Sequence, residues 1–359
     1  MKISKLLLIA FGISLFASCS NDDDNDNNNN NNDPKGNYEN GFFILNEGSD
    51  TSGKGTVSFS SNDFSFFAKD AYTAANAGDL LGKFVQNIFF DGDKAYIIAG
   101  GADVINVVNR YTFKLIAKID TGLVNPRYGV VKDGKAYVTN ANTYAEWGGA
   151  WDADGNTDDY VAVIDLATNK FESKINVNTT ANRIIEKNGK LYITDPNSTD
   201  KLSVVNIATK TVETPIIIGS SADTMEEKDG VLYILRGPFG SRSEIVKVKL
   251  SDKTTSTIAF PEALDGAGHM DIYKDKIYYT VSNSVYGITT TATEASTTPI
   301  VTATSVANLY GFAVNNDRIY LSDSGDYKSD SKAYIYNLTG TLQKELTVGI
   351  GPNGFYFND

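Results

Sequence analysis

The residues of this 359-residue chain that could do chemistry are few. Cys19 is the single cysteine and His269 the single histidine, which excludes internal disulfides, cysteine-rich metal sites and multi-histidine clusters. The chain has no nucleophile elbow, no zinc-protease helix motif and no phosphate-binding glycine loop. Carboxylates are numerous, so a glycosidase-type pair stays open. The sequence favours binding over catalysis, with a lactonase- or lyase-like enzyme recruiting His269 as the lesser alternative.

The charge balance argues against nucleic acid as a partner. The chain has 32 Lys and Arg against 44 Asp and Glu, a formal net charge of −12. Nucleic-acid phosphates need clustered basic side chains, which this composition does not supply. Hydrophobic residues make up 41% of the chain, enough to fill a substantial core.

An acidic segment could hold a calcium ion. Hard oxygen ligands alternate along it, and Gly155 allows a sharp turn; the ligands are Asp152, Asp154, Asn156 and Asp158. This spacing resembles part of a calcium-binding loop, although the glycine is displaced and the distal bidentate glutamate is absent. A solvated acidic turn is the alternative.

Residues 1–18 have the pattern of a secretory signal. Lys2 and Lys5 precede a short apolar run that is too short to span a bilayer. Phe16-Ala17-Ser18-Cys19 resembles a bacterial lipobox, in which the cysteine becomes the acylated first residue. We therefore expect lipidation at Cys19 and a lipid anchor in the outer membrane.

Residues 19–39 are expected to form a tether. After Cys19 the segment consists almost wholly of Asp and Asn, which bury no apolar surface. An acidic run at this place looks like the surface-export signal of Bacteroidota lipoproteins, and a solvated spacer is the alternative. The folded domain is then expected over residues 40–359, exposed on the cell surface.

A strand–turn–strand unit repeats along this domain. Asp-Gly or Asn-Gly turns precede a repeated tyrosine, and spacings of about 41 to 55 residues separate its copies, Tyr96, Tyr137, Tyr192, Tyr233, Tyr278 and Tyr320. Asp-Gly and Asn-Gly between β-rich runs predict type I′ hairpins. Two further alternating runs follow each hairpin, which makes four short antiparallel strands per unit. This is the pattern of a propeller blade.

The two ends of the domain complete the count. Residues 42–48 look like the second strand of a unit that lacks its first, and residues 354–359 look like a first strand with nothing after it. Joining them gives a seventh blade and removes an exposed sheet edge. We therefore predict an all-β fold, a seven-bladed β-propeller closed by strands from both termini.

One face of such a propeller gathers the irregular loops, which usually carry binding sites. The aromatic residues Tyr144, Trp147 and Trp151 lie in the longest insertion and are suited to stacking on a ligand, or else to capping a neighbouring blade. Arg236, Phe239 and Arg242 form a basic–aromatic loop suited to an amide, phosphate or carboxylate. Residues at the blade starts should point toward the axis, as ligand contacts or as a polar ring that closes the channel; they are Arg127, Arg183, Asp223, His269, Tyr310 and Asn353.

The lipobox, the acidic tether and these blades together resemble the YncE-like/DUF5074 propeller lipoproteins of Bacteroidota. Residues 42–48 look like the opening motif of that family. The resemblance implies a relationship to BtuG-type proteins, which capture cobalamin at the surface and hand it to a TonB-dependent transporter.

Two functions follow from this resemblance and from the loops. The first is a non-enzymatic surface lipoprotein that binds a small, corrinoid-like ligand and passes it to a TonB-dependent outer-membrane transporter. The second is a protein-interaction or structural propeller without a small ligand.

Overall fold

The computed structural model describes residues 35–49, 53–141, 158–196, 199–238 and 241–359. Lys35–Asp359 forms one compact unit. The signal segment, Cys19 and the acidic tract lie outside the described residues. No helix in the described part of the chain is both long and apolar enough to cross a bilayer.

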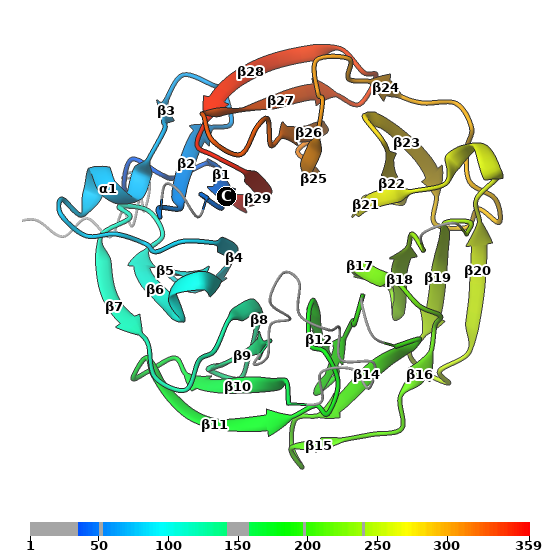
Figure 1. Ribbon diagram of the computed structural model, residues 1–359, viewed down its shortest axis with the longest axis horizontal. Helices are drawn as coiled ribbons and strands as arrows, with labels where there is room; N and C mark the ends of the chain where they lie inside the picture. The colour runs from blue at the N-terminus through cyan, green and yellow to red at the C-terminus, as the bar shows by residue number, and fades with distance from the viewer. Residues whose placement is uncertain (1–34, 50–52, 142–157, 197–198, 239–240) are drawn as a thin grey trace, which may run out of the picture. The chain divides into compact units, whose positions relative to one another are not determined.

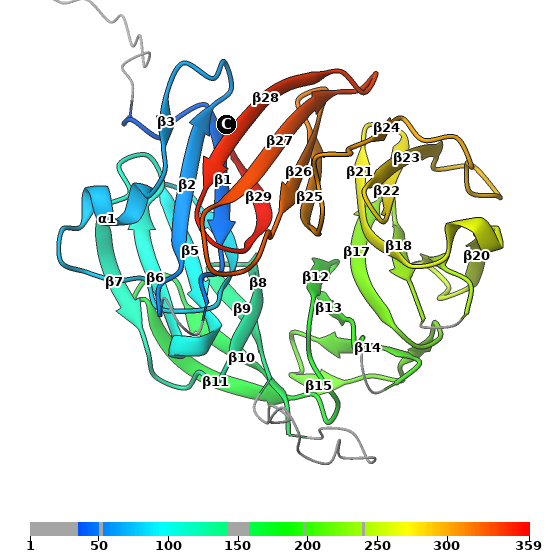
Figure 2. The same cartoon turned by 45° about the horizontal axis from the view of Figure 1, so that its top comes forward.

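Seven antiparallel sheets surround a central axis (Figure 1 and Figure 2). Four of them, each given from its axial strand outward, are β29 (Pro352–Asn358), β1 (Gly41–Asn46), β2 (Thr56–Ser61) and β3 (Phe67–Ala68); β4 (Val85–Asp91), β5 (Lys94–Ala99), β6 (Val104–Asn109) and β7 (Leu115–Ile119); β8 (Pro126–Lys132), β9 (Lys135–Asn140), β10 (Tyr160–Asp165) and β11 (Lys170–Asn176); and β12 (Ile184–Lys187), β13 (Lys190–Ile193), β14 (Lys201–Asn206) and β15 (Thr211–Val212), with β16 (Ile216–Ile217) also on β14.

The other three sheets are β17 (Ala222–Lys228), β18 (Val231–Arg236), β19 (Glu244–Lys249) and β20 (Thr255–Ala259); β21 (Ala267–Tyr273), β22 (Lys276–Val281), β23 (Ser284–Thr289) and β24 (Val301–Thr302); and β25 (Leu309–Asn315), β26 (Arg318–Asp323), β27 (Ser331–Asn337) and β28 (Leu342–Val348). Helical structure in the described residues is limited to α1 (Ala71–Ala75) and the 3-10 turns η1 (Gly100–Ala102) and η2 (Glu262–Leu264). The predicted all-β, seven-bladed propeller is confirmed.

Strands from both ends of the domain close the ring, as predicted. β1 pairs antiparallel with β29, so that Phe43 lies opposite Tyr356 and Ile44 opposite Phe355. Both strands lie beside each other near the C-terminus in Figure 1. Next to this pairing, the ring of Phe42 packs edge-on against Tyr320, with ring centroids 5.0 Å apart. Backbone hydrogen bonds and an aromatic cluster therefore hold the closing blade together.

The hairpin turns largely follow the predicted chemistry. Both turn residues have positive φ at Asp133-Gly134, Asn188-Gly189 and Asp229-Gly230, as a type I′ turn requires. The first hairpin differs, because Asp91 still pairs with Lys94 and the turn is formed by Gly92 and Asp93. Only Gly92 of these two has positive φ, so the expected type I′ turn at Asp91-Gly92 is wrong by one residue.

The repeated tyrosines pack in the core, where all six are at most 6% exposed. Tyr96, for example, stacks on Phe89 with ring centroids 4.9 Å apart and an interplanar angle of 2°. Its hydroxyl donates to Asn169 in the turn between β10 and β11 of the next blade, at 3.3 Å. The repeat therefore supplies contacts both within a blade and between blades.

Six of the seven axial strands carry a β-bulge near their start. In β21, for instance, Gly268 and His269 together face Thr280 alone, and the Thr280 hydroxyl accepts the N–H of His269 at 3.1 Å. Tyr128 in β8 makes the same contact with Thr139. A bulge re-aims side chains that would otherwise alternate between the two faces of the sheet. The axial strands can therefore direct extra side chains toward the axis.

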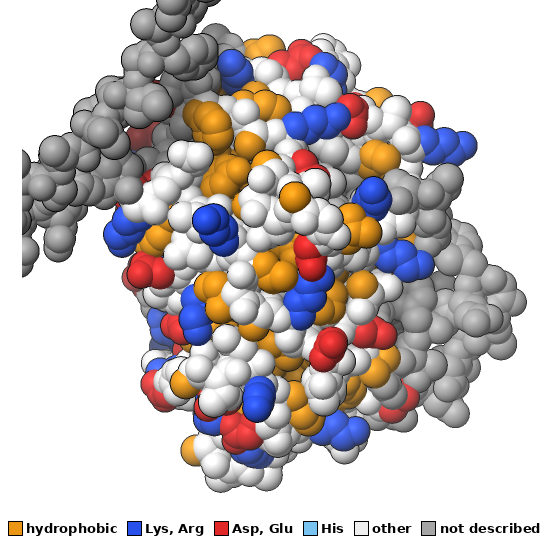
Figure 3. Space-filling model, turned by 90° about the vertical axis from the view of Figure 1, so that its left-hand side faces the viewer, with side chains coloured by type: hydrophobic (Ala, Val, Ile, Leu, Met, Phe, Trp, Pro, Cys, Tyr) orange, Lys and Arg blue, Asp and Glu red, His pale blue; other side chains and the backbone are white. Residues whose placement is uncertain are grey.

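The outer side of the propeller near α1, β3 and β7 shows charges of both signs among scattered apolar side chains (Figure 3). Phe66, Leu80 and Ile116 are among the exposed large apolar residues. Single apolar side chains of this kind are normal on protein surfaces. What the figure shows of this side therefore does not single it out as a binding surface.

Phe42→Ala tests the closing cluster. Removing this fully buried ring is expected to lower the free energy of unfolding by about 3 to 5 kcal/mol, because it leaves a cavity. Phe67→Ala on β3 of the same blade, where the side chain is 37% exposed, is expected to cost less than about 1 kcal/mol. Urea denaturation followed by circular dichroism measures both, and equal losses would contradict a special role for Phe42.

Candidate functional site

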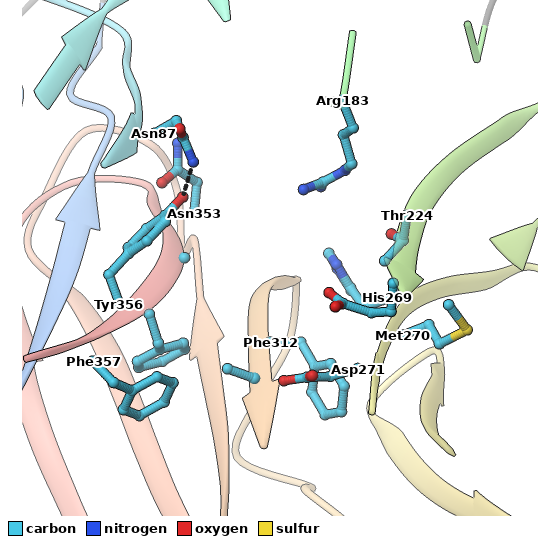
Figure 4. Close-up of a pocket in the computed structure, with 14 residues that line it drawn as sticks. Asn87, Arg183, Thr224, His269, Met270, Asp271, Phe312, Asn353, Tyr356 and Phe357 are labelled. Carbon is cyan, nitrogen blue, oxygen red and sulfur yellow. Dashed lines mark hydrogen bonds between the residues drawn. The ribbon is translucent and has the colours of Figure 1, made fainter. Parts of the chain in front are cut away.

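A cavity of about 210 Å³ lies among the axial strands. Figure 4 shows side chains reaching it from opposite sides of the axis. Most of its lining residues come from the axial strands, and Arg183 comes from the segment just before β12; the residues are Asn87, Arg183, Thr224, Glu226, His269, Met270, Asp271, Phe312, Ala313, Asn353, Gly354, Phe355, Tyr356 and Phe357. Three of the predicted axial residues, Arg183, His269 and Asn353, therefore share one cavity.

Arg183 is the cationic group of the cavity. Its Nε lies 3.2 Å from Oδ2 of Asp223, and its guanidinium covers the ring of Tyr128 at 4.7 Å. The other Asp223 oxygen accepts from the amide of Asn182 at 2.6 Å. Asp223 thus neutralises Arg183, and the aromatic face holds the guanidinium in place.

His269 is neutral at physiological pH. Burial lowers the pKa of its imidazole to about 4, and the positive charge of Arg183 lowers it further, against an opposing contribution from Asp223. The ring lies 6.4 Å from that of Phe312. A neutral imidazole offers the cavity one hydrogen-bond donor and one acceptor.

Glu226 and Asp271 are the two site residues with the most unusual placement. Each pairs across its hairpin with a repeated tyrosine, Tyr233 and Tyr278 respectively. In the corresponding register the other blades that start with their own axial strand have apolar residues, namely Phe89, Val130, Ile185 and Ala313. Two neighbouring blades therefore carry carboxyl groups where the repeat otherwise carries apolar side chains.

These two carboxyl groups affect each other. Burial raises the pKa of both, and the charge of Asp271 raises the pKa of Glu226 further. Arg183 opposes the shift at Glu226, and the N–H of Val314, which donates to Asp271 at 2.6 Å, opposes it at Asp271. A cavity that holds two such carboxyls favours their protonated forms or a cation between them.

Two neutral oxygens of the cavity have no hydrogen-bond partner among the described residues. They are Oγ1 of Thr224, a residue only 7% exposed, and Oδ1 of Asn353. Figure 4 shows the Thr224 side chain directed from β17 into the cavity. The amide nitrogen of Asn353 donates to the carbonyl of Val85 at 2.8 Å, which fixes that side chain. Buried polar atoms without a partner are uncommon in proteins and indicate a place for a ligand or water.

The other predicted axial residues lie in neighbouring contacts. The Tyr310 hydroxyl donates to the carboxylate of Glu47, and its ring meets that of Tyr327 edge-on at 5.4 Å. Burial raises the pKa of Glu47, with Tyr310 and Arg127 acting in the opposite direction. Arg127 donates to Asn182 at 3.4 Å, which connects it to the Arg183–Asp223 pair.

Arg236 of the predicted basic loop is held by its own surroundings. Its Nε donates to the carbonyl of Ser220 at 2.9 Å and one Nη donates to Glu244 at 2.7 Å. Arg242 is exposed. Phe239 and the aromatic residues Tyr144, Trp147 and Trp151 lie outside the described residues, so their roles stay predictions.

The calcium prediction also falls mainly outside the described residues, with Asp152, Asp154 and Asn156. Asp158 is described and exposed. The adjacent Asp159 is buried and accepts the N–H of Ala181 at 2.7 Å, so it braces the blade. Within the described ranges, no group of three or more His, Cys, Asp or Glu side chains is placed to hold a metal ion.

Sequence reasoning missed Glu226, Asp271, Thr224, Asn87 and Tyr356 as lining residues. Glu226 and Asp271 carried a usable signal, because alignment of the repeats shows acids at a position that is apolar in the other units. Thr224 carried no such signal, because its direction depends on the bulge in β17.

Residues 40–319 match the family described as "Domain of unknown function (DUF5074)". The chain belongs to this family. A search of curated proteins gave no significant match. The predicted relationship to DUF5074 propellers is therefore confirmed, and the family description assigns no activity.

Solved structures similar to this DUF5074 chain show the fold alone, because their sequence identities are low. A quinonprotein alcohol dehydrogenase-like protein from Bacteroides thetaiotaomicron has a TM-score of 0.67 at 19% identity, covering 90% of this chain and 80% of its own. A functionally unknown protein from Desulfotomaculum acetoxidans has a TM-score of 0.66 at 12% identity, covering 89% and 100%. Kuenenia stuttgartiensis hydrazine synthase has a TM-score of 0.57 at 14% identity, covering 77% and 92%.

The single histidine makes the cavity directly observable by NMR. In untagged protein we expect a pKa of about 4 for His269. Arg183→Gln is expected to raise this pKa because it removes a nearby positive charge, and Asp223→Asn to lower it because it removes a negative one. Lys274→Gln, at an exposed lysine on a hairpin turn, serves as the control and leaves it unchanged. A pKa near 6.5 in every variant would show that His269 is not enclosed.

Glu226→Gln tests the buried carboxyl pair through stability. A raised folded-state pKa means that stability is present below the ordinary carboxyl pKa and lost as pH rises through the raised value. The variant removes that loss, so at pH 9 it is expected to gain about 1 to 3 kcal/mol relative to its difference from wild type at pH 5. Glu227→Gln, at the next residue, where the side chain pairs with Lys187 at 2.6 Å, should show no such gain. Thermal unfolding at both pH values decides between them.

Proposed function

We propose that this DUF5074 chain is a non-enzymatic cell-surface lipoprotein that binds a small ligand at the loop-rich end of its propeller axis. The observation that carries the proposal is the polar cavity among the axial strands, with oxygens that have no partner in the described structure. Cavities with a few convergent polar groups and perturbed pKa values are the usual sites of small-ligand binding. Bulges in the axial strands bring these groups together.

The contacts of His269 favour binding over turnover. Nucleophilic catalysis needs a hydroxyl or thiol hydrogen-bonded to a base, with a third group orienting the base. Among the described contacts, the hydroxyl nearest in the chain of bonds, that of Thr280, accepts from the backbone of His269 and not from its ring. The neutral imidazole therefore fits a ligand contact.

The cavity volume limits which part of a ligand it can hold. Sites for drug-sized molecules usually measure about 300 to 1,000 Å³, more than the 210 Å³ found here. A corrinoid would lie across the loop-rich face, where the predicted contacts Tyr144, Trp147, Trp151 and Phe239 belong. We propose the corrinoid as the candidate for that face and delivery to a TonB-dependent transporter as the next step.

Anchoring through Cys19 completes the proposal. A lipid on Cys19 and the acidic tether would hold the propeller at the outer membrane, close to a transporter partner. Such an anchor is consistent with the lipobox resemblance at residues 16–19.

Titration of the detergent-solubilised lipoprotein with cobinamide and cobalamin, followed by absorbance and calorimetry, tests the ligand. Saturable binding is expected, and Trp147→Ala or Trp151→Ala should weaken it about tenfold, the effect of losing one aromatic stack. Phe66→Ala, an exposed aromatic between β2 and β3, is the control and should leave the affinity unchanged. An absence of binding for both corrinoids would exclude this ligand class.

A further inference from the structure

The axial cavity contains more hydrogen-bond acceptors than donors. Among the described residues, the Glu226 carboxylate has no hydrogen-bond partner, and Asp271 has only backbone donors. Oγ1 of Thr224 and Oδ1 of Asn353 also lack partners. Any molecule that satisfies these four groups together must bring several N–H or O–H donors.

The charges that face these groups also favour a cation. Arg183 is the only cationic side chain among the lining residues, and Asp223 pairs with it at 3.2 Å. Two carboxyls, Glu226 from β17 and Asp271 from β21, then have no opposite charge of their own. The remaining titratable groups, His269 from β21, Tyr356 from β29 and Tyr128 from β8, are neutral near pH 7, since burial lowers the pKa of His269 and raises that of Tyr356.

An organic ammonium group fits this arrangement better than a metal ion does. Within the described ranges, no three His, Cys, Asp or Glu side chains are placed as metal ligands. An ammonium group needs three acceptors at hydrogen-bond distance and tolerates looser geometry. The other lining residues include Phe312, Phe355 and Phe357, which can pack against a short apolar chain. At about 30 Å³ for each water-sized group, the volume holds about seven such groups.

We propose that the axial cavity binds the protonated amine of a small organic cation, with Glu226, Asp271, Thr224 and Asn353 as acceptors and the phenylalanines around its apolar end. This inference rests on the proposed function in so far as it takes the cavity to be a ligand site. It is independent of the corrinoid, which would lie on the loop-rich face.

Three probes of similar size and different charge test the proposal on the full chain: n-butylamine, 1-butanol and butyrate. Calorimetry and the NMR signals of His269 report binding. Butylamine should bind at least tenfold more tightly than the other two and shift the His269 resonances. Its affinity should rise between pH 6 and pH 9, because the carboxyls lose their protons while the amine, with a pKa near that of lysine, keeps its charge.

Variants separate this site from a non-specific effect of charge. Glu226→Gln should weaken butylamine binding at least tenfold and remove most of its pH dependence. Glu227→Gln, which changes the adjacent carboxylate paired with Lys187, should leave both unchanged. Thr224→Val keeps the shape of the side chain and removes one acceptor, so it should weaken binding several-fold even if the Glu226 variant is unstable.

Each outcome has a definite meaning. Equal or tighter binding of butanol or butyrate would overturn the amine assignment and leave the cavity as a ligand site. No binding of any probe at millimolar concentration would overturn both the amine assignment and the use of the cavity in the proposed function. Equal affinity in wild type and in the Glu226 and Thr224 variants would place the amine elsewhere on the protein.

Discussion

The pairing of β1 with β29 is the constraint on which the rest of this structure depends. Seven sheets surround an axis only if the last one is complete, and here it takes its axial strand from the C-terminus and its other three from the N-terminal part of the domain. The pairing leaves neither segment with an open edge toward the other. Phe42, Tyr320 and Phe355 then pack beside it, so that the closure joins two blades as well as two chain ends.

Closure has an electrostatic consequence at the axis. Axial strands packed side by side exclude bulk water from the side chains between them, and this changes the protonation of Glu226, Asp271 and His269. The acids hold their protons more strongly and the imidazole less strongly, as burial requires for groups of opposite charge type. The Arg183–Asp223 pair supplies its own compensation. The site is thus a product of the whole ring, because no single blade encloses these groups.

The fold could be predicted from the sequence because its signals are local and repeated. The spacing of Tyr96, Tyr137 and their equivalents marks the blades, and residues 42–48 and 354–359 show how they close. The site could be predicted only in part. Blade-start positions such as Arg183 and His269 follow from topology, whereas the direction of Thr224 depends on a local extra residue in β17. Compensating contacts, such as that of Arg236 with Glu244, depend on geometry between strands and are not visible in the repeat.

The bulges at the start of the axial strands separate two tasks within one strand. Beyond the bulge, strict alternation sets which side chains fill the space between blades; at the bulge, residues such as Asn353 and Tyr310 stand outside that alternation. A substitution there can change the character of the axis without shifting a side chain of the core to the wrong face of its sheet. The propeller is therefore built so that its ligand preference can vary independently of its stability.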